Sequence, residues 1–231
     1  MNLEKELEIY KKQGYVRIKN VFDEKECAQI KAEAYEELIK CHDDHPRLQW
    51  KNKKPALLFW PQDYNQFLRK IVFDPKMKKI VYQFLGTKEV RQINNQIYFR
   101  ESGDGDQFAW HQDICFRTPP QDFHEIEANY IQTVIAVDPI KDNGAIEFIP
   151  GSHYKNLNLI PRDNSELGLR KFVRGDWKGE KVVAHAGDVL VWNLLVVHGS
   201  EENISERSRM TYMSGFAAEK SVLNKHSYPE Y

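Results

Sequence analysis

Residues Arg91–Arg100 read RQINNQIYFR, and the alternation in this stretch decides the fold class of the chain. Polar and apolar side chains follow one another with a period of two, which predicts a β-strand with two different faces. The polar face carries Asn94, Gln96, Tyr98 and Arg100, and the apolar face carries Ile93, Ile97 and Phe99. We expect the apolar face to pack on helices and the polar face to point into a barrel that binds a polar ligand. A strand with its polar face in solvent is the alternative.

The chain on either side of this stretch has two different patterns. From Val90 onward, period-two segments alternate with Gly, Asn, Asp and Pro clusters, which favours an antiparallel sandwich or barrel. Before it, helical patterns dominate, apart from an alternating strand at Tyr15–Val21. The helices are expected at residues 3–13, at 24–39 after a capping box that begins at Asp23, and at 65–85 with a break before Pro75.

Two irregular segments are candidates for covers of the barrel. Residues 41–63 are polar, and we expect a solvated loop with aromatic anchors at Trp50 and Trp60, with a lid as the alternative. Residues 154–180 form a long insert that contains Arg162, Arg170, Arg174 and Trp177, and it is a second candidate for a mobile cover.

Composition excludes several classes of partner. The 231 residues carry 33 Lys and Arg against 34 Asp and Glu, so the net charge of -1 gives no reason to expect nucleic acid as a ligand. We find no stretch apolar enough to cross a membrane and no signal-like start, so we expect a cytoplasmic protein that needs no membrane and no obligate protein partner. Three widely spaced cysteines do not suggest a disulfide framework.

Three residues of the strand-rich region are candidate metal ligands. His111 and Asp113 are two residues apart, so on a strand their side chains point to the same side. The apolar segment Val189–Val197 delivers His198 at its end. Two imidazoles and one carboxylate can hold Fe(II) with open positions, as in non-haem oxygenases, although Zn(II), Mn(II) or Co(II) accept the same ligands.

Arg209 favours an oxygenase that uses an acidic cosubstrate. It begins a predicted strand after a turn at residues 203–206, and we expect this strand to lie beside that of His198. A guanidinium donates two parallel hydrogen bonds to a carboxylate, so an arginine near a metal suits an acid that chelates the metal at its other end. Arg207 points to the same side as Arg209 and is the weaker candidate.

Several motifs together resemble the phytanoyl-CoA dioxygenase family of Fe(II)/2-oxoglutarate-dependent oxygenases, and the likeness spans nearly the whole chain. The most specific segment begins at His198 and reads H-x-S-x-x-N-x-S-x-x-x-R through Arg209. The others are Gly14-Tyr15-Val16, Trp110-His111-Gln112-Asp113, Asn143-Gly144, Pro150-Gly151-Ser152-His153 and Ala186-Gly187-Asp188-Val189.

The resemblance implies a fold and a domain plan. The fold is mainly β with flanking α: a double-stranded β-helix, which is a jelly-roll or cupin-like barrel, with N-terminal helices packed on it. We expect one domain over residues 1–231, made of a helical preface at 1–89 and a barrel core at 90–218 with the insert at 154–180.

The resemblance also implies roles for particular residues. His111, Asp113 and His198 would bind Fe(II), Arg209 would hold the distal carboxylate of 2-oxoglutarate, and Tyr98 would contact this cosubstrate. Asn94, Gln96 and Arg100 would line the substrate pocket. His153 in the Pro-Gly-Ser-His turn and Trp192 in the apolar strand are expected to be structural.

The implied activity is a dioxygenase that uses Fe(II), 2-oxoglutarate and O2 and releases succinate and CO2. We expect hydroxylation of a small polar or carboxylated molecule, because the strand face at Asn94, Gln96 and Arg100 is polar. The alternatives are a metal-dependent cupin-like enzyme that does not use 2-oxoglutarate and a catalytically silent binding barrel.

Overall fold

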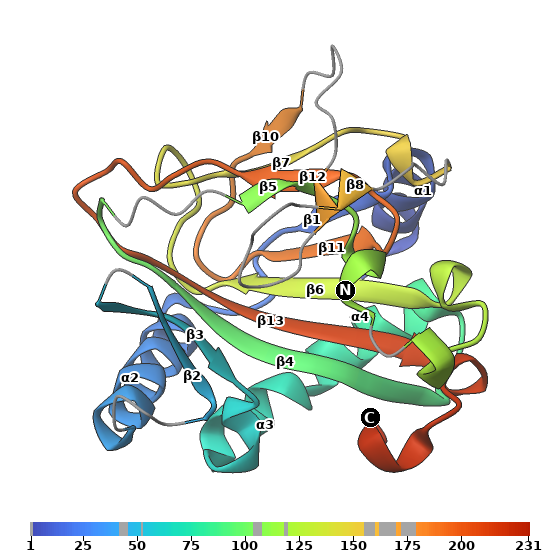
Figure 1. Cartoon of the computed structure of the whole chain (residues 1–231), viewed down its shortest axis with the longest axis horizontal. Coiled ribbons are helices and arrows are strands. Elements are labelled where there is room, and N and C mark those ends of the chain that lie inside the picture. The colour runs from blue at the N-terminus through green and yellow to red at the C-terminus, as the bar shows by residue number, and fades with distance from the viewer. Residues whose placement is uncertain are drawn as a thin grey trace.

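The computed structural model describes residues 2–41, 46–51, 53–103, 108–117, 120–154, 160–161, 170–171 and 179–231. Two β-sheets face each other across a cavity, and helices cover the outer side of the larger sheet (Figure 1). The larger sheet has the strand order β1-β11-β6-β13-β4-β3-β2, and the smaller has the order β10-β7-β12-β5. Every pairing between neighbouring strands is antiparallel. This arrangement is the double-stranded β-helix expected from the sequence.

The strands of the larger sheet come from both ends of the chain. They are β1 (Tyr15–Ile18), β2 (Leu48–Lys51), β3 (Lys54–Phe59), β4 (Val90–Arg100), β6 (Tyr130–Ala136), β11 (Val189–Asn193) and β13 (Arg209–Ala218). The smaller sheet consists of β5 (Phe108–His111), β7 (Ile146–Phe148), β10 (Glu180–Val182) and β12 (His198–Ser200). A separate pair joins β8 (Ile160–Pro161) to β9 (Arg170–Lys171).

The described part of residues 1–89 contains four α-helices: α1 (Glu4–Gln13), α2 (Glu24–Lys40), α3 (Gln66–Val72) and α4 (Pro75–Leu85). The expected start of α2 is confirmed, because Asp23 and Glu26 form a reciprocal capping box with both hydrogen bonds at 2.8 Å. The break before Pro75 is confirmed as well, since Asp74 caps the backbone N–H of Lys76 at 2.7 Å.

The main core lies between these helices and the larger sheet. It contains Ile30 of α2, Leu68 of α3 and Ile80 of α4, all fully buried against strand residues such as Ile97 and Phe99. Ile97 and Phe99 of β4 therefore pack on helices, as the alternation predicts, and the polar face turns to the cavity. Successive side chains of β4 thus point to opposite sides of the sheet. Ile93 departs from the prediction: it lies in a separate cluster with Ile126 and Tyr130, at the register shift between β4 and β13.

The structure corrects the expected helical preface at residues 1–89. Three strands from this part join the larger sheet, because β1 pairs with β11 and β3 pairs with β4. Residues 41–63 are thus not simply a solvated loop: those that are described include the hairpin β2–β3, which extends the sheet. Arg162, Arg174 and Trp177 of the insert lie outside the described residues, and so does most of the 154–180 segment.

Short 3-10 helices connect the strands. They are η1 (Pro61–Asp63), η2 (Asp113–Phe116), η3 (Pro120–Asp122), η4 (Ile126–Ala128), η5 (Ser152–Tyr154), η6 (Glu219–Ser221) and η7 (Lys225–Ser227). Within the described ranges, no helix combines the length and apolar character that a membrane span requires.

Candidate functional site

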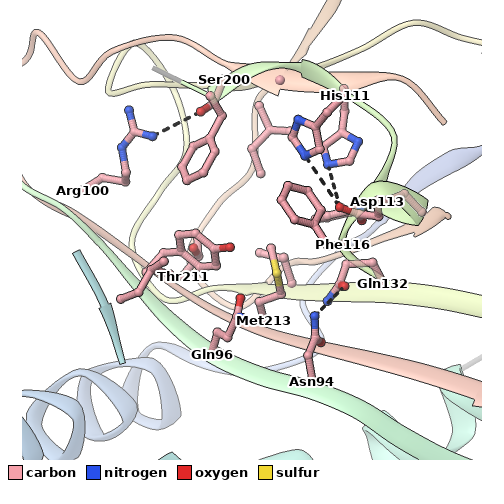
Figure 2. A pocket seen from close by; sticks show the side chains of 18 of the residues that line it. Asn94, Gln96, Arg100, His111, Asp113, Phe116, Gln132, Ser200, Thr211 and Met213 are labelled. Carbon is pink, nitrogen blue, oxygen red and sulfur yellow. Dashed lines mark hydrogen bonds and ion pairs between the residues drawn. The ribbon is translucent and has the colours of Figure 1, made fainter. Parts of the chain in front are cut away.

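Two histidines and an aspartate converge at one side of the cavity (Figure 2). His111 ends β5, Asp113 begins η2, and His198 begins β12, where it pairs directly with His111. The Nε2 atom of each histidine lies 3.6 Å from Oδ1 of Asp113. One donor atom from each residue lies within 4.8 Å of the other two, so a single metal ion can contact all three.

Neighbouring groups orient these donor atoms. Nδ1 of His198 donates a hydrogen bond to the carbonyl of Val196 at 3.0 Å, so the proton sits on Nδ1 and the lone pair of Nε2 faces the site. The indole Nε1 of Trp192 donates to Oδ2 of Asp113 at 2.7 Å. Because this bond occupies Oδ2, the other carboxylate oxygen is presented to the two histidines.

The charge state of the site at neutral pH suits metal binding. Burial, reinforced by the proximity of His111, lowers the pKa of His198 to about 4. Burial alone would raise the pKa of Asp113, but the attraction of His198 and His111 outweighs it, and the pKa of this carboxyl lies well below its usual range. At neutral pH the site therefore offers an ionised carboxylate and a neutral His198 imidazole, which are the forms that bind metals.

Arg209 lies in the same cavity but on the opposite sheet from His198. It begins β13, which pairs with β4 and β6, whereas β12 pairs with β5 and β7. The expectation that the two residues sit on adjacent strands is wrong, because the loop after β12 crosses from the smaller sheet to the larger one. Both side chains still line the cavity.

A turn fixes the guanidinium of Arg209. Its Nε donates to the carbonyl of Asn143 at 3.1 Å and its Nη2 to the carbonyl of Gly144 at 2.9 Å. Gly144 has φ +82, and a Cβ there would lie 2.9 Å from the carbonyl oxygen of Glu201. The Asn143-Gly144 turn is thus both a tight turn and the support that holds Arg209 in place.

The larger sheet forms the cavity floor, and the polar face of β4 lies on it as predicted. Asn94, Gln96, Tyr98 and Arg100 all line the cavity, whose volume is about 370 Å³. Arg100 pairs in register with Arg209, and its Nη1 and Nη2 donate to Oγ of Ser200 at 3.2 Å and to the carbonyl of Glu201 at 2.8 Å (Figure 2). The two arginines occupy the same end of the floor.

Two weaker candidates lie elsewhere. Arg207 is exposed and does not line the cavity, which separates it from the buried Arg209. His153 lies in η5, where its Nε2 is 3.1 Å from the carbonyl of Lys11, so it belongs to a turn as expected.

Several lining residues escaped prediction from the sequence. Trp192 is in the core, as expected, yet it also lines the cavity and contacts Asp113. Leu57 and Phe59 reach the cavity from β3, which lies in a segment expected to be a loop. Gln132 and Arg117 also line it, and neither stands in a recognisable motif. The apolar run Leu57-Leu58-Phe59 is the one signal that predicts a strand there.

The fold and the site together define a class of protein. A double-stranded β-helix that brings two histidines and one carboxylate to a cavity between its sheets is the arrangement of non-haem Fe(II) oxygenases. The donor set of imidazole nitrogens and a carboxylate oxygen fits Fe(II), and a buried arginine in the same cavity suits the distal carboxylate of 2-oxoglutarate.

Comparisons with known proteins agree with this class. The family model of phytanoyl-CoA dioxygenase (PhyH) matches residues 10–211. Ectoine dioxygenase of Bordetella bronchiseptica is 23% identical over 243 residues, which cover 96% of this chain and 78% of the relative. The chain belongs to the phytanoyl-CoA dioxygenase family.

Solved structures share the fold. The crystal structure of EctD from S. alaskensis with 2-oxoglutarate and 5-hydroxyectoine has a TM-score of 0.79 at 16% identity, over 93% of this chain and 76% of that one. The epimerase SnoN in complex with Fe3+ and alpha ketoglutarate has a TM-score of 0.74 at 22% identity, over 93% and 83% of the two chains.

The protein is therefore a non-haem Fe(II)- and 2-oxoglutarate-dependent dioxygenase. Family membership and the metal-binding geometry favour this class over a cupin-like enzyme without 2-oxoglutarate and over a silent binding barrel.

Proposed function

We propose that the protein hydroxylates a small polar or carboxylated molecule. The observation that carries this proposal is the convergence of His111, Asp113 and His198 in a cavity that also contains Arg209. When bound, Fe(II) with 2-oxoglutarate and O2 supplies the oxidising power to replace a C–H hydrogen by a hydroxyl group, while 2-oxoglutarate becomes succinate and CO2.

The residues of the chain bind and orient the reactants. His111, Asp113 and His198 hold Fe(II), with Trp192 fixing the carboxylate. Arg209 holds the distal carboxylate of 2-oxoglutarate, and the carbonyls of Asn143 and Gly144 keep its guanidinium in position. Tyr98 contacts the cosubstrate from near the C-terminal end of β4.

The substrate lies on the polar part of the floor. Asn94, Gln96 and Arg100 offer amide and guanidinium groups along the cavity face of β4, which supports a polar or carboxylated substrate. The apolar walls, including Phe108 and Phe116, limit the access of water to the reacting atoms.

We propose further that residues 1–231 act as a single cytoplasmic domain that needs no partner other than its small-molecule ligands. The strands of residues 1–89 belong to the same sheet as the barrel strands, which supports one domain. All three cysteines are free thiols, which supports a reducing compartment.

Anaerobic titration of the Fe(II)-loaded protein with 2-oxoglutarate tests the proposed roles. We expect a visible metal-to-ligand charge-transfer band in the wild type that is lost in His198→Ala. In Arg209→Ala, the Kd for 2-oxoglutarate should rise about tenfold or more, because a charge-assisted pair contributes at least about 1.4 kcal/mol.

Arg207→Ala is the matched control, since it removes an exposed arginine two residues away and should leave both the band and the Kd unchanged. No band in the wild type at saturating 2-oxoglutarate would refute the proposed site. Hydroxylation itself is tested by mass spectrometry under ¹⁸O2, where a substrate should gain one labelled oxygen as succinate forms.

A further inference from the structure

One row of residues across the larger sheet forms a polar network at the end of the floor opposite to Arg100 and Arg209. In register, Trp192 of β11 pairs with Gln132 of β6, Gln132 with Gly215 of β13, and Gly215 with Asn94 of β4. Over Gly215, the Nδ2 atom of Asn94 donates to Oε1 of Gln132 at 3.3 Å (Figure 2). The same Oε1 accepts from the hydroxyl of Tyr130 at 2.7 Å.

The network exists because position 215 has no side chain. A Cβ on Gly215 would lie 2.0 Å from the hydroxyl oxygen of Tyr130 and 2.6 Å from Oδ1 of Asn94. Both side chains therefore use the space above the glycine, where a larger residue would separate them. Glycine inside a strand commonly marks such a close approach.

Arg117 lies next to this network and brings a positive charge to the cavity. It follows η2, the element that begins with Asp113, and it lines the cavity. Its guanidinium carbon lies 5.1 Å from the ring centroid of Tyr130. A cation over an aromatic face is held in place by this contact but keeps its full charge.

The charge of Arg117 acts on Asp113 at longer range, but its guanidinium has no close carboxylate partner within the part of the chain that the structure describes. None of the ion pairs within 4.0 Å found there includes Arg117, and its buried Nε has no hydrogen-bond partner there. Oδ1 of Asn94 is likewise buried and has no partner among those residues. A buried donor or acceptor without a partner costs about 1–3 kcal/mol, more for a charged group, and a bound ligand can recover this cost.

This group of residues lies beside the candidate metal site and away from Arg100. In Figure 2, Asn94 and Gln132 lie below Asp113, whereas Arg100 and Ser200 lie toward the opposite side of the cavity. Asn94 and Arg100 are six residues apart on β4, which corresponds to about 20 Å at the rise of a strand. Trp192 joins the row to the site through its bond to Asp113. A molecule held by Arg117 is thus next to the reaction centre.

We propose that Arg117 anchors a carboxylate of the substrate, with the Asn94–Gln132 network accommodating a polar group beside it. A guanidinium matches a carboxylate with two parallel hydrogen bonds, which is why the geometry favours this anion. The cavity of about 370 Å³ also has to contain 2-oxoglutarate, so the substrate is compact. Its body packs against Phe116, Val134 and Met213. This inference rests on the proposed function and names the substrate class and its anchor.

The test compares acids with their own amides. Anaerobic protein loaded with Fe(II) and 2-oxoglutarate is titrated by calorimetry with benzoic acid, phenylacetic acid, cyclohexanecarboxylic acid and L-proline, and with the primary amide of each. We expect at least one acid to bind the wild type about tenfold or more tightly than its amide, which corresponds to about 1.4 kcal/mol.

Variants of Arg117, Arg207 and Arg100 locate the anchor. Arg117→Gln should remove the preference for the acid while it keeps the charge-transfer band of 2-oxoglutarate, so a folding defect is excluded. Arg117→Lys should retain part of the preference, because it keeps the charge and loses the fork geometry. Arg207→Gln is the matched control and should bind both probes as the wild type does.

Three results would contradict the proposal, and each of them refutes a different part of it. A preference that persists in Arg117→Gln but disappears in Arg100→Gln would move the anchor to Arg100 and refute the proposal. A wild type that shows the band but prefers no acid over its amide would refute the carboxylate anchor alone. A wild type without the band would refute the proposed function and, with it, this inference.

Discussion

Asp113 illustrates how a single residue can perform two tasks. Its Oδ1 faces His111 and His198, and its Oδ2 accepts the hydrogen bond of Trp192. The indole is 1% exposed and cannot be replaced by water without a large rearrangement. The bond therefore selects one carboxylate orientation before any metal binds, which is the form of preorganisation that metal sites depend on.

Replacement of this indole should weaken metal binding without unfolding the protein. In Trp192→Phe the ring remains apolar and the hydrogen bond to Asp113 is lost, so we expect a 10- to 100-fold weaker affinity for Fe(II), about the usual effect of losing such a support. Anaerobic competition with a chromogenic chelator measures this affinity.

Trp50→Phe is the control for this variant, because Trp50 is 38% exposed and does not line the cavity. An Fe(II) affinity in Trp192→Phe equal to that of the control would show that the indole bond does not support the metal site.

The sequence predicts the residues with distinctive chemistry and not their supports. His111, Asp113, His198 and Arg209 stand in patterns whose spacing has a chemical meaning, and all four line one cavity. Trp192 could not be identified in the same way, because a tryptophan within an apolar run looks the same whether or not its N–H meets a carboxylate. Its role depends on the register between strands, which no local pattern encodes.

At the scale of elements, the loop between β12 and β13 is what brings Arg209 to the opposite sheet. Asn203, fully buried in this loop, donates through Nδ2 to the carbonyls of Arg100 and Arg207 at 2.9 and 2.8 Å. Its Oδ1 accepts from the backbone N–H and the hydroxyl of Ser205 at 3.1 and 2.7 Å. One amide thus ties the loop to the end of β4.

Loss of this amide should destabilise the protein and displace Arg209. We expect Asn203→Ala to lower the free energy of unfolding by about 2–4 kcal/mol, because it removes the buried bond to the carbonyl of Arg100 and the part-buried bonds to Ser205 and Arg207. Urea denaturation measures this loss, and the Kd for 2-oxoglutarate should rise in the same variant at a temperature where it is folded.

Ser205→Ala is the graded comparison, since it removes only the hydroxyl and keeps the amide bonds to Arg100 and Arg207. Equal destabilisation by the two substitutions would contradict the central role of Asn203.

The hairpin β2–β3 shows why some elements could not be predicted. The turn residue Lys53 has φ 62, and Trp60 after β3 has φ 52, although neither is glycine or asparagine. The sequence between the two strands reads Asn52-Lys53 and not Asn-Gly, so the usual hairpin signal is absent and the polar stretch looks like a loop. β3 gains its stability from pairing with β4, a contact between distant parts of the chain that overrides local propensity, and β2 pairs in turn with β3.

On the scale of the whole molecule, buried tyrosines make stability sensitive to alkaline pH. Burial raises the pKa of Tyr10, Tyr130, Tyr212 and Tyr231 far above the usual value. In the unfolded chain these hydroxyls lose their protons near pH 10, while the folded protein keeps them. The stabilisation is therefore complete below about pH 10 and is lost as pH rises above it.

We expect the free energy of unfolding to fall by about 1.4 kcal/mol per pH unit for each buried tyrosine above pH 10. Urea midpoints between pH 8 and pH 11 measure the slope. In Tyr212→Phe the unfolding free energy should fall less steeply with pH, by the contribution of one tyrosine. An unchanged slope would show that buried tyrosine hydroxyls do not cause the loss of stability. Lysines titrate in the wild type and in Tyr212→Phe alike, so their contribution cancels in the difference between the two slopes.

The individual strands and helices could be predicted from the sequence more completely than the order in which the strands pair. Alternation along Arg91–Arg100 predicted the strand and its cavity-facing polar side, and the capping box at Asp23 predicted the start of α2. The order of the strands could not be predicted, because pairing is decided by the packing of the complete sheet. For the same reason Arg209 was expected beside His198 and lies across the cavity instead.

The strand order of the larger sheet has a consequence for synthesis of the chain. Tyr15 pairs with Trp192, and β13, which is made last, lies in the middle of the sheet between β4 and β6. A nascent chain emerges from the ribosome with its N-terminus first, so the early strands wait for partners that are translated much later. A chain that ends before Arg209 already contains all three residues of the candidate metal site, yet it lacks the strand that joins the two halves of the sheet.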